Sequence, residues 1–144
     1  MSDAPRLSHL NLNVSDLRRS VCFYQQVFGL EVLHESTDEI EADGRRVEVR
    51  QAVLTAPGTR DLLALTQADP FPVGPGGLNH FGFVFTSNDH VRVAIERAVQ
   101  LGGGIIRQGE RDGNGVHEVF AYIRDPDGYA IEFSTQEILL RSTR

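Results

Sequence analysis

The stretch LSHLNLNVSDLRRSVCFYQQVFG, residues 7–29, joins a half-buried strand to an amphipathic helix. Its first part alternates polar residues with apolar residues such as Leu10 and Leu12, which predicts a strand with one face in the core. Its second part carries apolar residues at helical spacing. A helix is therefore predicted from an N-cap at Ser15 to a terminating glycine at Gly29.

The same pattern returns in NHFGFVFTSNDHVRVAIERAVQLGGG, residues 79–104. Phe81, Phe83 and Phe85 alternate with smaller residues, as in a strand that buries one face. The helix that follows is predicted to begin near Ser87, and glycines again stand at its end. The repetition indicates that the chain is built from two similar halves.

Each half continues with three strand candidates. They lie at residues 30–36, 46–55 and 61–67 in the first half and at 104–108, 117–124 and 129–134 in the second. The turn sequence Asp-Pro-Asp-Gly at 125–128 joins the last two. The sequence thus predicts a single domain of the α+β class with two βαβββ modules, at about 6–67 and 79–135. A linker rich in proline and glycine joins them at 68–78, and their strands are expected to form one curved mixed sheet around a central metal cavity.

Three side chains of these strands are expected to point away from the apolar faces: His9, His80 and Glu132. His80 shares its face with Gly82, and Glu132 has Ala130 beside it on its own face. Two imidazoles and one carboxylate on strand faces with small neighbours resemble the facial triad that binds divalent metals. Because His9 and His80 occupy the same place in the two halves, we predict that all three are ligands of one metal ion.

The composition excludes several classes of function. The chain has 144 residues, with 40% hydrophobic and 24% charged residues, as in an ordinary globular protein. Its formal net charge of -6 argues against nucleic acid and against an acidic membrane surface as partners. Cys22 is the single cysteine, so an intrachain disulfide is excluded and a cytoplasmic location is expected. Cys22 is predicted to be a buried, unreactive thiol.

Three motifs resemble those of the vicinal oxygen chelate superfamily, which includes glyoxalase I, bleomycin-binding proteins, methylmalonyl-CoA epimerase, fosfomycin-resistance thiol transferases and type I extradiol dioxygenases. The motifs are HLNLNVSDL from His9, LNHFGF from Leu78 and RDPDGYAIEF from Arg124. The resemblance covers about residues 6–135. It implies the two-module fold, whereas the activity stays open because this scaffold hosts many chemistries.

The resemblance also implies metal ligands on the first and last strands of each half. Three of the four positions match, at His9, His80 and Glu132, whereas the fourth aligns with Ala64. Glyoxalase I carries a glutamate there and the epimerase a polar amide. The departure at Ala64 disfavours both activities. It leaves the two-His-one-Glu set of extradiol dioxygenases and fosfomycin transferases.

Tyr122 and His117 are the candidate catalytic residues. Tyr122 precedes Glu132 by ten residues in YIRDPDGYAIE, which is similar to the end of the extradiol signature. His117 lies only five residues before Tyr122, closer than the histidine of that signature. It is therefore interpreted either as a proton shuttle or as a surface residue.

The expected function is that of a homodimeric metalloenzyme acting on a small oxygen-rich substrate, most similar to an extradiol dioxygenase. Fe(II) is the favoured metal, with Mn, Zn and Ni as alternatives. Two other functions stay open: a metal-free protein that binds a drug or natural product, and a lyase or transferase similar to glyoxalase or the thiol transferases. The site could form within one chain or across a dimer interface.

Overall fold

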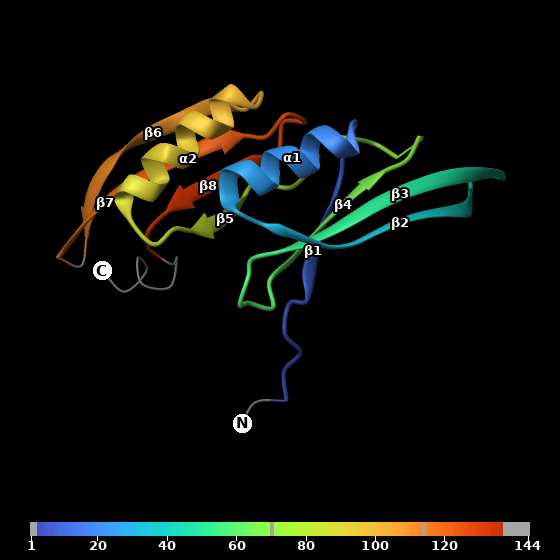
Figure 1. The fold of residues 1–144 in the computed structure, drawn as a ribbon, viewed down its shortest axis with the longest axis horizontal. Helices are drawn as coiled ribbons and strands as arrows, with labels where there is room; N and C mark the ends of the chain where they lie inside the picture. Colours follow the sequence, from blue (N-terminus) through green and yellow to red (C-terminus); the bar gives the residue numbers. More distant parts are fainter. Residues whose placement is uncertain (1–2, 70, 114, 137–144) are drawn as a thin grey trace. The chain divides into compact units, whose positions relative to one another are not determined.

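The structure, a computed structural model, describes residues 3–69, 71–113 and 115–136. Its elements follow the predicted order of strand, helix and three strands, twice (Figure 1). The first half contains β1 (His9–Asn13), α1 (Leu17–Phe28), β2 (Glu31–Ala42), β3 (Arg45–Thr55) and β4 (Leu62–Gln67). The second contains β5 (Phe81–Val84), α2 (Asn88–Gln100), β6 (Gly104–Gly113), β7 (Val116–Arg124) and β8 (Ala130–Ser134). The predicted α+β class is confirmed.

The strands form two four-stranded mixed sheets with the same topology. Their orders are β1-β4-β3-β2 and β5-β8-β7-β6. In each sheet the first strand runs parallel to the last strand of its own half, and the other pairs are antiparallel. The hydrogen-bonded ladders thus stay within each half, and the single curved sheet that we expected is replaced by two sheets.

The chain divides into two compact units. One holds β1 to β4 with most of α1, and the other holds β5 to β8 with α2. The boundary between Val73 and Gly74 falls within the segment predicted as a linker. The last residues of α1, Gln26–Phe28, belong to the second unit, where the ring of Phe28 stacks on that of Phe83 with a centroid distance of 4.1 Å.

The ends of the helices were predicted closely, with one correction. The N-cap of α1 is Asp16, whose carboxylate accepts a hydrogen bond from the Arg19 backbone N–H. Ser15, the predicted cap, instead accepts a hydrogen bond from the Arg19 guanidinium at 2.8 Å. The prediction of Gly29 as the end of α1 is confirmed, since it takes the left-handed conformation with φ of 70°. The predicted start of α2 near Ser87 is also confirmed, and Ser87 is its N-cap.

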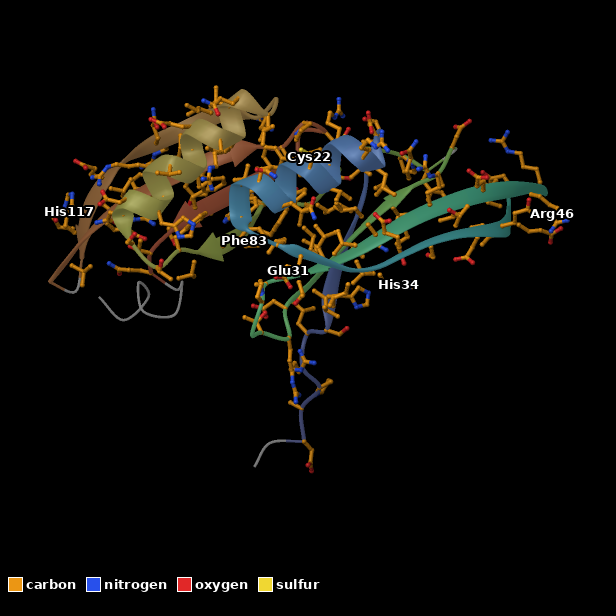
Figure 2. All side chains as sticks on the ribbon, viewed as in Figure 1. Cys22, Glu31, His34, Arg46, Phe83 and His117 are labelled. Carbon is orange, nitrogen blue, oxygen red and sulfur yellow. The ribbon has the colours of Figure 1, made fainter. Side chains whose placement is uncertain are left out.

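Three further sequence expectations were wrong. The strand predicted at 104–108 extends to Gly113 in β6. The strand predicted at 30–36 extends to Ala42, because Asp43 and Gly44, both at positive φ, form a tight turn that pairs β2 with β3 along its length. Cys22 is exposed on α1, since Phe23, Tyr24 and Val27 occupy the buried side of that helix (Figure 2). None of the described helices is long and apolar enough to cross a membrane.

Candidate functional site

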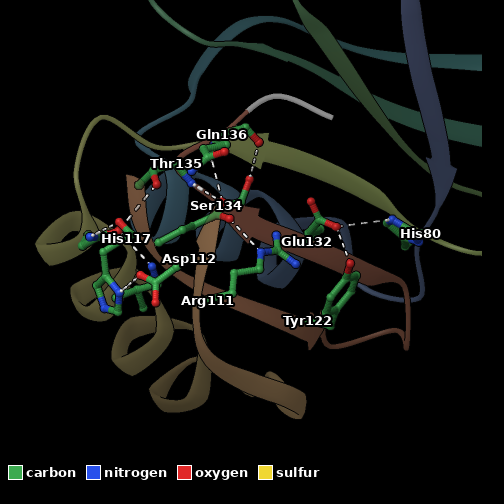
Figure 3. Close-up of polar contacts among 12 residues, drawn as sticks. His80, Arg111, Asp112, His117, Tyr122, Glu132, Ser134, Thr135 and Gln136 are labelled. Carbon is green, nitrogen blue, oxygen red and sulfur yellow. Dashed lines mark hydrogen bonds and ion pairs between the residues drawn. The ribbon is translucent and has the colours of Figure 1, made fainter. Parts of the chain in front are cut away.

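The second unit brings His80, Tyr122 and Glu132 together from three strands. Tyr122 on β7 pairs with Glu132 on β8, and Glu132 also pairs with Gly82 on β5. Paired residues of neighbouring strands share a face, and so do residues two apart in one strand. His80, which directly precedes β5, therefore lies on the same face of the sheet as Tyr122 and Glu132, as Figure 3 shows.

The three side chains meet at one carboxylate oxygen. His80 Nε2 lies 3.8 Å from Glu132 Oε1, and the Tyr122 hydroxyl donates a short hydrogen bond to the same oxygen (Figure 3). The rings of His80 and Tyr122 stand nearly perpendicular, with centroids 5.3 Å apart. Glu132 is 6% exposed, so its carboxylate is buried between an imidazole and a phenol.

The neighbours of this cluster orient the imidazole and leave room beside the carboxylate. The side-chain oxygen of Asn79 lies 2.6 Å from His80 Nδ1. Because an amide oxygen only accepts, this contact fits a proton on Nδ1, and that tautomer would leave Nε2 available as a metal ligand. At Gly82 a Cβ atom would stand 3.4 Å from the Glu132 Cβ, so glycine leaves the carboxylate uncrowded. An oriented imidazole and a buried carboxylate fit a divalent metal in their chemistry.

The first unit contains the third predicted ligand. His9 is exposed, and it shares a face of its sheet with Asn11, which pairs with Ala64 on β4. The Asn11 side-chain oxygen accepts a hydrogen bond from the Thr66 hydroxyl at 2.8 Å. Ala64, the position that the resemblance associates with a fourth ligand, thus lies on the same sheet face as His9 and is 5% exposed.

The described ranges contain no group of three or more His, Cys, Asp or Glu side chains arranged to hold a metal ion. His80 and Glu132 are brought together, whereas His9 belongs to the other unit. The structure therefore provides a pair of the predicted ligands, and their joint binding of a metal with His9 stays a prediction.

His117 lies apart from Tyr122 (Figure 3), close to the start of β7. It is five residues away on the same strand and therefore points to the opposite face. Its Nδ1 lies 2.9 Å from Asp112 and its Nε2 lies 3.5 Å from Glu110. These two carboxylates, Asp112 above all, raise the pKa of His117 above its ordinary value. Its surroundings are those of a surface ion-pair cluster.

The sequence analysis did not identify two arginines near the cluster. Arg107 on β6 and Arg124 on β7 line a cavity of about 440 Å³ together with His80 and Tyr122. The alternation of residues in β7 places Arg124 on the same face as Tyr122 and could have indicated it. Arg107 reaches the cavity through its pairing with Tyr122, which the sequence does not reveal.

A third arginine on this sheet has a structural role. Arg111 Nε lies 2.7 Å from the fully buried carboxylate of Glu118. The same carboxylate accepts hydrogen bonds from the backbone N–H groups of Thr135 and Gln136 (Figure 3). Glu118 on β7 therefore connects Thr135 and Gln136, which follow β8, with Arg111 on β6.

Comparison with known proteins agrees with the fold and the motifs. The sequence profile of the Glyoxalase/Bleomycin resistance protein/Dioxygenase superfamily matches residues 6–133. Lactoylglutathione lyase of Salmonella typhimurium is 31% identical over 132 residues, covering 88% of this chain and 90% of the lyase. Catechol-2,3-dioxygenase of Bacillus subtilis is 33% identical over 132 residues, covering 88% of this chain but 40% of the dioxygenase.

Solved structures of the same kind share the fold. The fosfomycin resistance protein FosX of Listeria monocytogenes aligns with a TM-score of 0.68 at 21% identity, covering 98% of this chain and 99% of FosX. A glyoxylase/bleomycin resistance protein/dioxygenase domain from Frankia aligns with a TM-score of 0.70 at 21% identity, covering 94% of this chain and the whole domain. With the profile match over nearly its whole length, the chain belongs to the Glyoxalase/Bleomycin resistance protein/Dioxygenase superfamily.

Proposed function

We propose that this chain is a metal-dependent enzyme in which His9, His80 and Glu132 hold a divalent metal ion and a small oxygen-rich substrate binds beside it. The observation that carries the proposal is the meeting of His80, Tyr122 and Glu132 at one buried carboxylate oxygen. A bound divalent metal would supply a Lewis acid that polarises a substrate oxygen. Under this proposal Asn79 keeps His80 Nε2 free to act as a ligand.

A dioxygenase similar to the extradiol enzymes is the first candidate within this proposal. Ala64 supplies no fourth ligand, so a two-His-one-Glu site would keep positions open for a substrate with two adjacent oxygens and for dioxygen. Fe(II) suits that chemistry, and Mn, Zn or Ni would suit reactions without dioxygen. In this proposal Tyr122, whose hydroxyl donates to Glu132, passes a proton to or from a substrate oxygen.

A lyase is the second candidate, and the relatives favour it. The lactoylglutathione lyases match over 90% of their own length, whereas the catechol dioxygenase matches over 40% of its length. Their names place a thiol conjugate and a catechol, respectively, as substrates. The two candidates therefore differ in their need for dioxygen, and an assay can separate them.

The test begins with the metal content of protein purified without chelators, measured by elemental analysis. The expected result is one equivalent of divalent metal per chain. The protein is then stripped and reloaded separately with Fe(II), Mn, Zn or Ni, and each form is assayed for oxygen uptake with catechols and for turnover of lactoylglutathione. Oxygen uptake with the iron form supports the dioxygenase, and turnover of the thiol conjugate supports the lyase. A protein without metal and without gain on reloading would contradict both and favour a binding protein.

A homodimer is part of the proposal. A dimer of this 16.0 kDa chain would have a mass of twice 16.0 kDa in light scattering. Such an assembly would allow His9 of one copy and His80 with Glu132 of another to complete a site.

A further inference from the structure

Two arginines line a cavity beside the His80–Tyr122–Glu132 cluster. The cavity measures about 440 Å³, which lies within the range of small-molecule sites. Arg107 and Arg124 line it together with Asn79, Ile106 and the small residue Ala130. All these residues belong to the second unit, so the cavity lies within one folded unit.

The strand pairing explains why both guanidinium groups reach this cavity. Arg107 pairs with Tyr122, and Arg124 pairs with Ala130, so both arginines stand on the same face as Tyr122 and Glu132. A bulge between Ile105 and Arg107 sets this register. The row Arg107–Tyr122–Glu132 lies next to the row Arg124–Ala130. Arg107 on β6 and Arg124 on β7 are therefore diagonal neighbours, and the small Ala130 stands on the β8 side of Arg124.

Neither arginine is paired with a carboxylate within the described part of the chain. Two neighbouring arginines differ: Arg111 on β6 pairs with Glu118 at 2.7 Å, and Arg92 on α2 pairs with Asp89 and Glu110. Arg107 instead lies over the ring of Phe120, with its Cζ 5.2 Å from the centroid, and Arg124 makes one long contact of 3.4 Å to the Gly128 carbonyl. Stacking on an aromatic ring leaves the N–H edge of a guanidinium free to bind an oxyanion.

In a chain with a negative net charge, two arginines without a carboxylate partner point to a role in binding an anion. With 14 basic and 20 acidic residues, the chain offers many carboxylates with which an arginine could pair. Two unpaired guanidinium groups in one cavity therefore concentrate positive charge where the molecule as a whole is negative. An arginine presents a planar fork that matches a carboxylate in two parallel hydrogen bonds.

We propose that Arg107 and Arg124 bind a carboxylate group of the substrate, so that the substrate is a small carboxylic acid whose opposite end reaches His80 and Tyr122. This inference names the substrate class of the proposed enzyme and in that respect rests on the proposed function. Arg107 and Arg124 are then specificity-determining residues, because a neutral analogue would leave both guanidinium groups without a partner. Binding of the carboxylate itself requires only the second unit and no metal.

The test compares 3,4-dihydroxybenzoate with 3,4-dihydroxybenzamide, which keeps both adjacent hydroxyls and replaces the carboxylate by a neutral amide. Dissociation constants are measured by calorimetry for the full chain, both stripped of metal and loaded with it. The wild type is expected to bind the acid about tenfold or more tightly than the amide. Arg107→Gln and Arg124→Gln should each weaken binding of the acid by about tenfold and leave the affinity for the amide unchanged. Arg107→Lys keeps the charge but loses the planar fork, so its affinity for the acid should lie between those of the wild type and Arg107→Gln.

Arg97→Gln is the matched control, since it removes the same charge from an exposed position on α2 in the same unit, and Arg97 does not line the cavity. It should bind both compounds as the wild type does. Equal affinity of the wild type for acid and amide would overturn the inference. So would an equal loss of acid binding in Arg97→Gln and Arg107→Gln, because long-range charge would then explain the effect. The metal content of the same samples reports separately on the proposed function, since the metal can be lost while discrimination between acid and amide persists.

Discussion

Glu132 illustrates how far a single residue can be predicted from strand alternation. Its place between the apolar Ile131 and Phe133, both fully buried, put its side chain on the opposite face, and the structure places it there beside His80 and Tyr122. Arg107 could not be found in this way. A bulge between Ile105 and Arg107 shifts the register of β6. Counting alternate residues along the sequence therefore does not predict the face on which Arg107 lies.

Glu132→Ala should remove the metal while the fold survives. The substitution deletes an anionic ligand, but the neighbouring core contacts of Ile131 and Phe133 remain. Because the lost carboxylate is buried, the free energy of unfolding of the metal-free protein should change by only about 1 kcal/mol in either direction. Elemental analysis, chemical denaturation and activity assays on the same sample measure the three quantities.

Glu132→Gln is the control for shape, since it keeps the volume and removes the charge. It should lose metal as the alanine variant does. Full metal content and activity in Glu132→Ala would contradict the proposed ligand set, and a variant that fails to fold would show that Glu132 is structural.

Ala64→Glu tests the open position on the first sheet. Ala64 is 5% exposed, so a carboxylate there should cost roughly 1–3 kcal/mol of stability without metal. If position 64 faces the metal site, added Zn or Mn should restore the stability of Ala64→Glu. The metal should also bind to this variant more tightly than to the wild type. Activity that needs an open position should fall.

Thermal unfolding with and without metal measures the effect on Ala64→Glu. Ala64→Gln serves as the neutral comparison and should gain less from metal. A metal-dependent rise in melting temperature no larger than that of the wild type would place position 64 away from the ion.

At the scale of elements, the sequence predicted the helices better than the strand ends. Helix caps are local, so Ser87, Gly29 and the neighbourhood of Asp16 could be recognised from a few residues. The length of β2 depends on its pairing with β3 through the turn at Asp43–Gly44. The second half of β2 is mostly polar and shows no apolar alternation. In the sequence, only the turn residues Asp43 and Gly44 indicate that the strand continues to that point.

The β6–β7 hairpin carries a pH-dependent contact at His117. Hydrogen bonds to Asp112 and, to a smaller degree, Glu110 raise its pKa, and Arg92 on α2 shares Glu110. A raised pKa in the folded state means that the contact stabilises fully below the unfolded value of about 6.5 and is lost as pH rises through the folded value. Denaturation of wild type and His117→Gln should therefore differ more at acidic pH than at alkaline pH.

Nuclear magnetic resonance titration of His117 gives the direct check. Asp112→Asn should lower the pKa of His117 toward its ordinary value, because it removes the strongest of its anionic partners. The His117→Gln variant should keep its activity if His117 belongs to the surface. A loss of turnover without a change in stability would favour the proton-shuttle interpretation instead.

At the scale of the molecule, the repeat predicted two equivalent halves, but the sequence could not show which copies of the chain share a site. Two units with their own sheets carry the predicted ligands, His9 on one and His80 with Glu132 on the other. Alternation fixes the face of each ligand within its sheet. It contains no information about the meeting of two sheets, which depends on docking and assembly.

His9→Ala and Glu132→Ala should each bind little metal alone, because either change removes one of three ligands. When the two variants are unfolded together and refolded as a mixture, half of a dimeric population should be mixed dimers. If the ligands of one site come from two chains, each mixed dimer has one intact site, and about a quarter of the wild-type metal content should return. If they come from one chain, none should return. Full metal content in His9→Ala alone would contradict the role of His9 and confine the metal proposal to the second unit.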